Sequence, residues 1–389
     1  MDYSDFFSLD AQNFMRSPVR DIFKVVDLNS IYSFAGGYPD AQTFPLDKMK
    51  ELTTTVVEKY GAKALQYGPT QGIKELREAL AKRYDVPCDN ILISTSSQQG
   101  IDICARVLLD PDDIVLTANP TYLGALQSFK SYRAQVVGMD LSPTLQAAKK
   151  REEQIKDILS KGKKIKYFYT IPDFQNPSGE TLSLAQRSEL VALARKYNFL
   201  IVEDSPYREL RYEGKPVATI YSLAPERTIH LCSFSKIFAP GLRLGWIVAN
   251  ETILNKLYEC KQSLDLCAPI FDQYLMVEFI NSGMLERNLP KSIALYKRKR
   301  DMMISLLEKY MPEGVTWTHP EGGLFLFLTL PEKIDTIELY DKALKAGVAY
   351  VAGSFFYVDG SHKNTMRLNF SFIDSARMED GIKILASLI

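Results

Sequence analysis

Seven short apolar runs divide the middle of the chain, and they show little alternation of polar and apolar positions. Runs of this kind are typical of strands that are buried on both faces of a sheet. Amphipathic helical patterns, such as those at 98–109 and 184–197, lie between them. The alternation predicts the α/β fold class, with a large domain built on a seven-stranded, mostly parallel sheet. The runs cover residues 91–95, 114–117, 135–139, 165–170, 199–203, 228–232 and 245–249.

The pattern changes after about residue 285. A long basic helical segment covers 285–310, and shorter strand-like and helical runs follow it, which predicts a smaller α+β domain. The basic run 297–300 is predicted to be a solvated helix face, because acidic residues flank it. The later runs are strands at 315–317, 323–328 and 366–370 and a helix near 337–346. We expect an N-terminal arm (1–35) that joins the small domain, a large domain (36–285) and a small C-terminal domain (286–389).

Charge and composition narrow the function. The chain has 47 Lys and Arg against 47 Asp and Glu, so its formal net charge is zero. A nucleic-acid-binding protein needs a basic surface, which this balance argues against. The longest apolar stretch, near 324–330, is far below the roughly 20 residues of a membrane helix. With no signal-peptide pattern at the N-terminus, we expect a cytoplasmic protein. Five cysteines without a CxxC motif and three dispersed histidines argue against disulfides and against a metal site.

Polar residues follow the predicted strands at the edge where an open parallel sheet binds its ligands. Ser96, Ser97 and Gln98 follow the first run and open a helix, where free N–H groups favour a phosphate, although simple helix capping would explain them equally well. The other loops supply an aromatic ring, an amide, a carboxylate, a phenol, two hydroxyls, a lysine and an arginine. These residues are Tyr122, Asn176, Asp204, Tyr207, Ser233, Ser235, Lys236 and Arg243.

Two of these residues indicate a particular cofactor. Lys236 lies between small residues and an apolar segment, where it would lose its proton more easily, as an amine nucleophile requires. Asp204 ends a buried strand and needs a cationic partner there, which a protonated pyridine nitrogen would provide. A reactive lysine, an aspartate for the pyridinium and a phosphate cup are the parts of a pyridoxal phosphate site.

At these residues the chain resembles the fold-type-I pyridoxal-phosphate-dependent aminotransferases of class I/II. It is most similar to the branch that contains 2-aminoadipate, kynurenine and multi-substrate aromatic aminotransferases. The resemblance covers nearly the whole chain. It is carried by SPVRDIFK (17–24), SFAGGYPDAQTFP (33–45), QYGPTQG (66–72), SSQQGID, NPTY, PDFQNPSG, EDSPY, SFSKIFAPGLRLGW, EGGLFLFL (321–328) and MRLNFS (366–371).

The resemblance implies a role for each matching residue. Lys236 would bond to the cofactor and move the substrate's Cα proton, and Asp204 would pair with the pyridinium. Tyr207 and Asn176 would hydrogen-bond the cofactor's phenolate oxygen, and Tyr122 would stack on its ring. The phosphate would be held by Ser96, Ser97, Gln98, Ser233, Ser235 and Arg243, with Tyr67 reaching the partner subunit's phosphate in a homodimer.

The same resemblance implies a substrate site. Arg367 would clamp the α-carboxylate of the substrate in a bidentate geometry that lysine would not reproduce. Asn176 and the backbone of Gly37 would assist, and Arg20 would lie on a segment that covers the site. Asn176–Pro177 is a candidate cis peptide. The chain departs from the family pattern at three positions, Ser96 (commonly Gly), Ala352 (usually Pro) and Tyr38 (commonly aliphatic).

The predicted activity is transfer of an amino group from an L-amino acid to a 2-oxo acid by a ping-pong mechanism, and 2-oxoglutarate is the expected acceptor. Three alternatives stay open at this point. One is another pyridoxal phosphate reaction, β-elimination or decarboxylation. A second is the sensor half of a transcription regulator, although only about 35 residues precede SFAGG, too few for its DNA-binding domain. The third is a nicotinamide dehydrogenase, which would need a GxGxxG motif after the first strand; this chain has none there.

Overall fold

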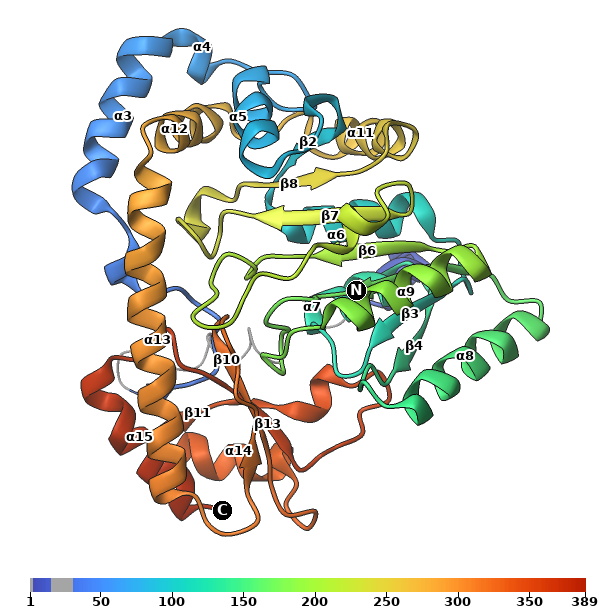
Figure 1. The fold of residues 1–389 in the computed structure, drawn as a ribbon, viewed down its shortest axis with the longest axis vertical. Helices are drawn as coiled ribbons and strands as arrows, with labels where there is room; N and C mark the ends of the chain where they lie inside the picture. Colours follow the sequence, from blue (N-terminus) through green and yellow to red (C-terminus); the bar gives the residue numbers. More distant parts are fainter. Residues whose placement is uncertain (1–2, 15–30) are drawn as a thin grey trace.

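The computed structural model describes residues 3–14 and 31–389. Seven of the described strands form one sheet in the order β2-β8-β7-β6-β5-β3-β4 (Figure 1). β8 is antiparallel to both of its neighbours, and the other ladders are parallel. This confirms the predicted α/β class and the mostly parallel sheet. The strands are β2 (Ile91–Ser94), β3 (Ile114–Ala118), β4 (Gln135–Met139), β5 (Ile165–Thr170), β6 (Leu200–Asp204), β7 (Thr228–Ser233) and β8 (Gly245–Val248).

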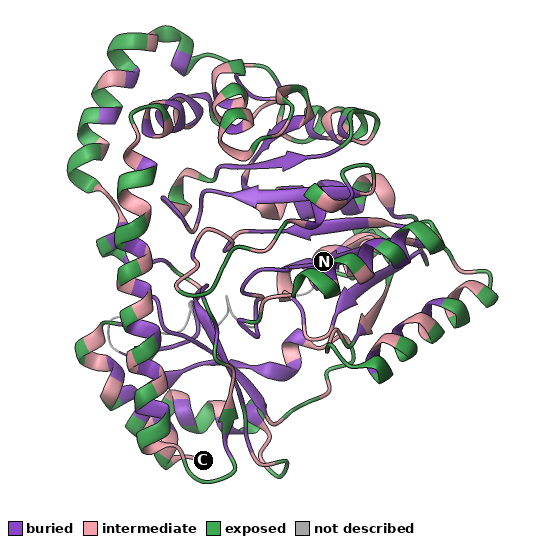
Figure 2. Ribbon diagram, viewed as in Figure 1, coloured by how far each residue is buried: buried purple, intermediate pink, exposed green. Residues whose placement is uncertain are grey.

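Helices cover both faces of this sheet, so its strands are largely buried except for the edge strand β4, as Figure 2 shows. On one face α6 (Ser96–Leu108) packs on β7 and β8, with α7 (Leu123–Ser131) and α11 (Glu251–Asp265) beside it. On the other face, α8 (Leu145–Ser160), α9 (Leu184–Tyr197) and α10 (Ile220–Leu223) share a second apolar cluster with the strands. The remaining helices of this part are α1 (Leu9–Gln12), α3 (Leu46–Tyr60), α4 (Ala62–Leu65), α5 (Lys74–Tyr84) and α12 (Ile270–Asn281).

Local sequence explains where these elements begin and end. Ser183 and Gln186 form a reciprocal capping box at the start of α9, which satisfies two of the free N–H groups there. Asn198 ends the helix in the left-handed conformation that asparagine tolerates. The helix predicted at 184–197 therefore has the observed bounds.

The C-terminal part forms a smaller α+β unit, drawn in orange and red in Figure 1. Its four-stranded sheet has the order β12-β13-β10-β9, and a separate pair joins β1 to β11 in parallel. Residues 32–33 therefore pair with the C-terminal part. The strands are β1 (Tyr32–Ser33), β9 (Thr316–Trp317), β10 (Phe325–Thr329), β11 (Val348–Ala349), β12 (Val351–Ala352) and β13 (Thr365–Asn369); the helices are α13 (Met284–Tyr310), α14 (Thr336–Lys345) and α15 (Ser375–Ser387).

The basic run 297–300 is only partly the solvated face that its flanking acids predicted. Lys299 is buried and donates to the carbonyls of Ser371 and Ile373 at 2.9 and 2.7 Å and to the carboxylate of Asp40. Arg300 is also buried and donates to the carbonyl of Pro320 at 2.6 Å. Buried cations need such partners, so these two residues tie α13 to neighbouring loops.

Along the described ranges 3–14 and 31–389, no helix combines the length and the apolar character needed to cross a membrane.

Candidate active site

The carboxyl ends of β6 and β7 bring the predicted lysine and aspartate to the same edge of the sheet. Asp204 is the last residue of β6, and Lys236 lies three residues beyond β7. The half-buried Nζ of Lys236 donates to the carbonyl of Gly37 at 2.8 Å. Burial, together with the charges of Arg243 and Arg367, lowers the pKa of Lys236 to about 8. A substantial share of the amine is therefore neutral near physiological pH, as a nucleophile or base must be.

Asp204 provides the strongest sign of an absent cationic partner. The residue is 2% exposed, and its Oδ2 accepts a hydrogen bond from Tyr169 at 2.8 Å. Its Oδ1 has no hydrogen-bond partner among the described residues. Burial raises the pKa of Asp204 to about 7, although the nearby hydroxyls of Tyr169 and Ser97 lower it. A protonated ring nitrogen at Oδ1 would satisfy the free oxygen and stabilise the carboxylate, so the residues present fit a pyridoxal cofactor.

Three further predicted residues surround the same space. Tyr207 is buried and contacts Phe325 edge to face, with 5.7 Å between ring centroids. Burial raises the pKa of Tyr207, so its hydroxyl keeps its proton and can act as a donor. The hydroxyl of Tyr122 bonds to the side chain of Gln98 at 3.1 Å. Asn176 is buried, and its peptide bond with Pro177 is cis, as predicted; Asn119–Pro120 is a second cis bond that was not predicted.

The predicted phosphate cup lies at the N-terminus of the 13-residue helix α6. Ser96 has a φ of 63°, in the left-handed region that favours glycine, and its Oγ accepts a hydrogen bond from Arg243. The substitution of serine for the glycine common in the family thus strains the backbone but holds an arginine. The hydroxyl of Ser233 accepts the N–H of Ser235 at 3.1 Å. Arg243 itself is exposed.

Arg367 is held from several sides on β13. It is 4% exposed and donates to Oδ1 of Asn176 at 2.8 Å and to the carbonyl of Ala35. Its guanidinium lies over the rings of Phe325 and Phe356, 4.3 and 5.1 Å from their centroids. Nε has no hydrogen-bond partner within the described part of the chain. Burial lowers the pKa of Arg367 to about 10, and no carboxylate is among the groups that offset this shift.

The remaining predicted residues fall into different places. Gly37 lies beside Lys236, as above, and Tyr67 is 81% exposed on the surface. Arg20 lies outside the described residues. Of the two other departures, Tyr38 is exposed and packs edge to face on Phe372, and Ala352 is buried in β12.

Sequence reasoning missed Tyr169, which binds Asp204. It lies inside an apolar strand, where its ring resembles a core residue. The available signal was the tendency of consecutive strands to pair, because Tyr169 pairs with Val202, two residues before Asp204 and on the same face of β6. Among the residues that the structure describes, no group of three or more His, Cys, Asp or Glu side chains is placed to bind a metal.

Comparison with known proteins gives matches along almost the whole chain. Residues 34–385 match the family described as "Aminotransferase class I and II". The chain is 45% identical to "Aromatic-amino-acid aminotransferase 1" of Thermococcus litoralis, over 100% of this chain and 95% of that protein. It is 33% identical to the 2-aminoadipate transaminase of Thermus thermophilus, over 99% and 96%. The solved structure of Pyrococcus horikoshii kynurenine aminotransferase, described as a complex with PMP, KYN and KYA, superposes with a TM-score of 0.94 at 44% identity, over 100% and 97% of the two chains.

Proposed function

Because this chain belongs to the family of class I and II aminotransferases, we propose that Lys236, Asp204 and Arg367 carry its amino-group transfer from an L-amino acid to a 2-oxo acid. The protein is an aminotransferase that depends on pyridoxal 5′-phosphate. Family membership favours this activity over β-elimination, decarboxylation, a sensor function and nicotinamide chemistry. The observation that carries the residue assignment is the free Oδ1 of buried Asp204 at the sheet edge that also presents Lys236.

When bound, pyridoxal phosphate supplies an electron sink that makes the substrate's Cα–H acidic and stores the amino group between the two half-reactions. Asp204 would hold the ring nitrogen in its protonated form, and Tyr169 would fix the carboxylate in place. Tyr207 and Asn176 would donate to the phenolate oxygen, and Tyr122 would cover the ring. Ser96, Ser97, Gln98, Ser233, Ser235 and Arg243 would hold the phosphate.

Lys236 would move the proton at the substrate's Cα. With a pKa of about 8, its amine accepts a proton near neutral pH and returns it without a large energetic cost. The carbonyl of Gly37 fixes the position of Nζ in the free enzyme. A base that is already held in position lowers the entropic part of the activation barrier for proton transfer.

Arg367 would bind the α-carboxylate of both substrates. Two aromatic rings and Asn176 fix the plane of its guanidinium, and its charge lacks a carboxylate partner within the described protein. A substrate carboxylate would provide that partner through two parallel hydrogen bonds. Because amino and oxo acid share this group, one arginine would serve both half-reactions of a ping-pong mechanism.

We further propose that the donors are aromatic amino acids and 2-aminoadipate, with 2-oxoglutarate as acceptor, in the cytoplasm. The names of the two relatives support these donors. Tyr38 follows Gly37, which binds Lys236, and would lie near the substrate side chain. A panel of aromatic, branched-chain, aspartate, glutamate and 2-aminoadipate donors tests this, and equal rates for all of them would contradict it.

The proposal includes a homodimer in which Tyr67 reaches the partner subunit's phosphate. Its support is a group of highly exposed large apolar side chains that would otherwise face water. They are Leu65 and Tyr67, 80% and 81% exposed, and Leu266, 56% exposed. We keep the division into residues 1–35, 36–285 and 286–389 as part of this proposal. Sedimentation analysis of the chain and of Tyr67→Ala, with cofactor affinity measured in parallel, tests the dimer and the role of Tyr67.

The decisive experiment on the residue assignment is Lys236→Ala. The variant should lose the absorbance band of the lysine-bound cofactor and should show no multiple turnover, while circular dichroism shows a folded chain. Lys256→Ala, a change of an exposed lysine of α11, is the control. Full transamination by Lys236→Ala would refute the assignment.

A further inference from the structure

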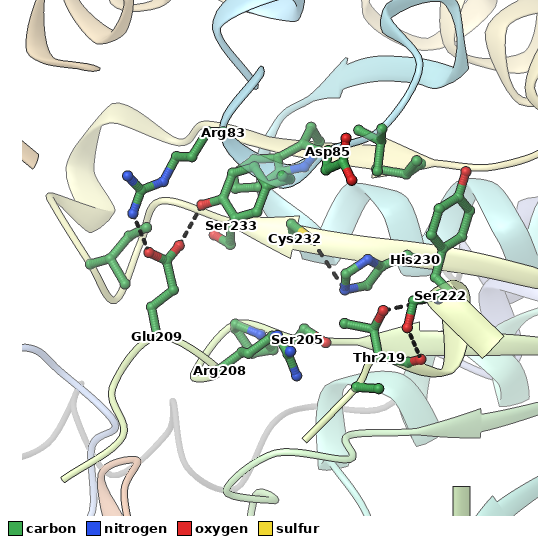
Figure 3. A pocket seen from close by; sticks show the side chains of 18 residues that line it. Arg83, Asp85, Ser205, Arg208, Glu209, Thr219, Ser222, His230, Cys232 and Ser233 are labelled. Atoms are coloured by element: carbon green, nitrogen blue, oxygen red, sulfur yellow. Dashed lines mark hydrogen bonds and ion pairs between the residues drawn. The ribbon is translucent and has the colours of Figure 1, made fainter. Parts of the chain in front are cut away.

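A cavity of about 400 Å³ lies on the face of the central sheet opposite α6 (Figure 3). His230 and Cys232 of β7 and Trp246 of β8 line it. The alternate residues of these strands, Leu231 and Ile247, face α6, where they approach Gly100. Because successive side chains of a strand point to opposite faces, the sheet separates this space from the face that carries Asp204. We call it the reverse-face cavity.

Ser205 places an unsatisfied polar group in the wall of this cavity (Figure 3). The residue is only 8% exposed, and its Oγ has no hydrogen-bond partner in the described ranges. A buried hydroxyl left in this state is unfavourable, because it has lost its bonds to water without replacing them. A ligand atom that bonds to it would recover this free energy, and the volume is that of a small-molecule pocket.

The charges of the wall are already paired inside the protein. Arg83 forms an ion pair with Glu209, which Figure 3 shows at one end of the cavity. Arg208 donates to Asp173 at 3.0 Å and to the carbonyl of Val217 at 2.8 Å. Asp85 is exposed at the edge, where water and salt screen its charge. A charged ligand would therefore lose its hydration without gaining an unpaired buried counter-charge, which favours a neutral one.

Aromatic rings form much of the rest of the cavity wall. Trp246 and Tyr221 line the cavity, and the His230 ring stacks on Tyr221 with 6.1 Å between centroids. Burial lowers the pKa of His230, so its ring is neutral at physiological pH, and its Nε2 lies 3.4 Å from the Sγ of Cys232. Flat, uncharged walls of this kind suit a planar ligand.

We propose that the reverse-face cavity is a second binding site, for a small neutral aromatic molecule with one hydrogen-bonding group directed at Ser205. Its position also couples it to the catalytic edge. Ser205 directly follows Asp204, and the lining residue Ile237 directly follows Lys236. A bound molecule restrains both neighbours from behind and so alters the surroundings of the cofactor-binding lysine. The site is an effector site rather than part of the substrate site.

Benzamide is a suitable probe, because it is neutral and planar and carries one amide. The chain has two tryptophans, so Trp317→Phe leaves Trp246, in the cavity wall, as the sole emitter. Benzamide added to the cofactor-loaded Trp317→Phe enzyme should change the tryptophan emission saturably. It should also shift the pH midpoint of the cofactor's absorbance change, a readout independent of turnover.

Three variants test whether benzamide binds in the reverse-face cavity. Two of them remove a hydroxyl group, and the third fills the cavity. In the Trp317→Phe background, Ser205→Ala should weaken benzamide binding about three- to tenfold, the value of one hydrogen bond. Ser222→Ala is the matched control, because that hydroxyl is at the exposed rim and already donates to the carbonyl of Thr219 at 2.7 Å. Val86→Phe should fill the cavity without adding a tryptophan and should abolish the response.

Three results would overturn the proposal: no saturable change of emission, equal affinity in Ser205→Ala and its parent, or an equal loss in Ser222→Ala. Circular dichroism and cofactor absorbance of each variant show that it is folded. Because Ser205 and Ser222 take no part in the proposed transamination, failure here leaves the catalytic assignment unchanged.

Discussion

The buried centre of the site and its exposed phosphate cup hold their charges in opposite ways. In the centre, Asp204 and Arg367 are almost fully buried, and each has a polar atom without a partner in the described protein. In the cup, Arg243 is exposed and is held by the hydroxyl of Ser96 and, at 3.4 Å, by the carbonyl of Pro240. The side chains of the centre are therefore held in place before any ligand binds, and burying their unpaired polar atoms lowers the stability of the free protein. The charge of Arg243 in the cup is instead exposed to water until a ligand binds. The following predictions test this difference.

The largest effect is expected for Arg367→Lys. Lysine keeps the charge but loses the planar fork that the Phe325 and Phe356 rings hold in place. Loss of two charge-assisted hydrogen bonds should lower kcat/KM by about 1,000-fold. Cofactor affinity, measured by absorbance titration, should stay within about threefold. An equal loss of cofactor affinity would mean that the centre and the cup are not independent.

Asp204→Asn should make the stability of the cofactor-free protein less sensitive to pH. Because burial raises the pKa of Asp204 to about 7, the folded chain holds a proton there that the unfolded chain loses near pH 4. The stability of the parent therefore falls as pH rises through this window, and asparagine does not titrate. The stability difference in favour of the variant should grow by up to roughly 4 kcal/mol from pH 4 to pH 8.

Urea denaturation at several pH values measures this difference. The exposed carboxylate change Asp341→Asn serves as the control and should give a nearly constant offset. A difference between Asp204→Asn and its parent that does not depend on pH would show that Asp204 has a cationic partner within the free enzyme.

In the cup, Arg243→Ala should weaken cofactor binding by about 10- to 100-fold, the loss expected for charge-assisted hydrogen bonds to a phosphate. At saturating cofactor, the KM for the amino acid should change little. Absorbance titration and steady-state kinetics separate the two quantities. A raised KM with unchanged cofactor affinity would assign Arg243 to the substrate instead.

The smallest effects are expected at Ser96, where two variants distinguish the hydrogen bond to Arg243 from the strain of the backbone. Ser96→Ala and Ser96→Gly both remove the hydroxyl that holds Arg243, so both should weaken cofactor binding by about two- to tenfold. Only glycine relieves the backbone at a φ of 63°, by about 1 kcal/mol. The cofactor-free glycine variant should therefore unfold about 2 °C above the alanine variant in a calorimeter. Equal melting temperatures would show that position 96 is not strained.

Most of the large domain could be predicted because its strands are uninterrupted apolar runs. Strands β4 and β5 have the predicted bounds, β6 is shifted by one residue, and the other strands of the central sheet differ by one residue at one end. The two-residue strands β1, β11 and β12 were missed, because two residues carry no detectable period. They form only through partners distant in sequence.

The site shows the same division. Lys236, Asp204 and Arg367 could be placed because polar residues after buried strands, or within a recognisable motif, stand out. Tyr169 could not, because inside a strand its ring resembles core packing and its hydroxyl acts only through the neighbouring strand. Lys299 was assigned to solvent for a related reason, since its partner Asp40 lies 259 residues away. Sequence patterns report on neighbouring residues, whereas these two pairs join residues that are distant in the sequence.

The placement of β13 has a consequence for how the protein is made. Arg367 lies 22 residues before the last residue given, on a strand between β10 and β12, and it binds the carbonyl of Ala35 near the other end. During synthesis, the sheet with Asp204 and Lys236 leaves the ribosome well before this arginine. The nascent chain thus has Asp204 and Lys236 before it has Arg367. The hydrogen bond from Arg367 to the carbonyl of Ala35 forms only after β13 has been made, so it joins segments that are distant in sequence at a late stage of folding.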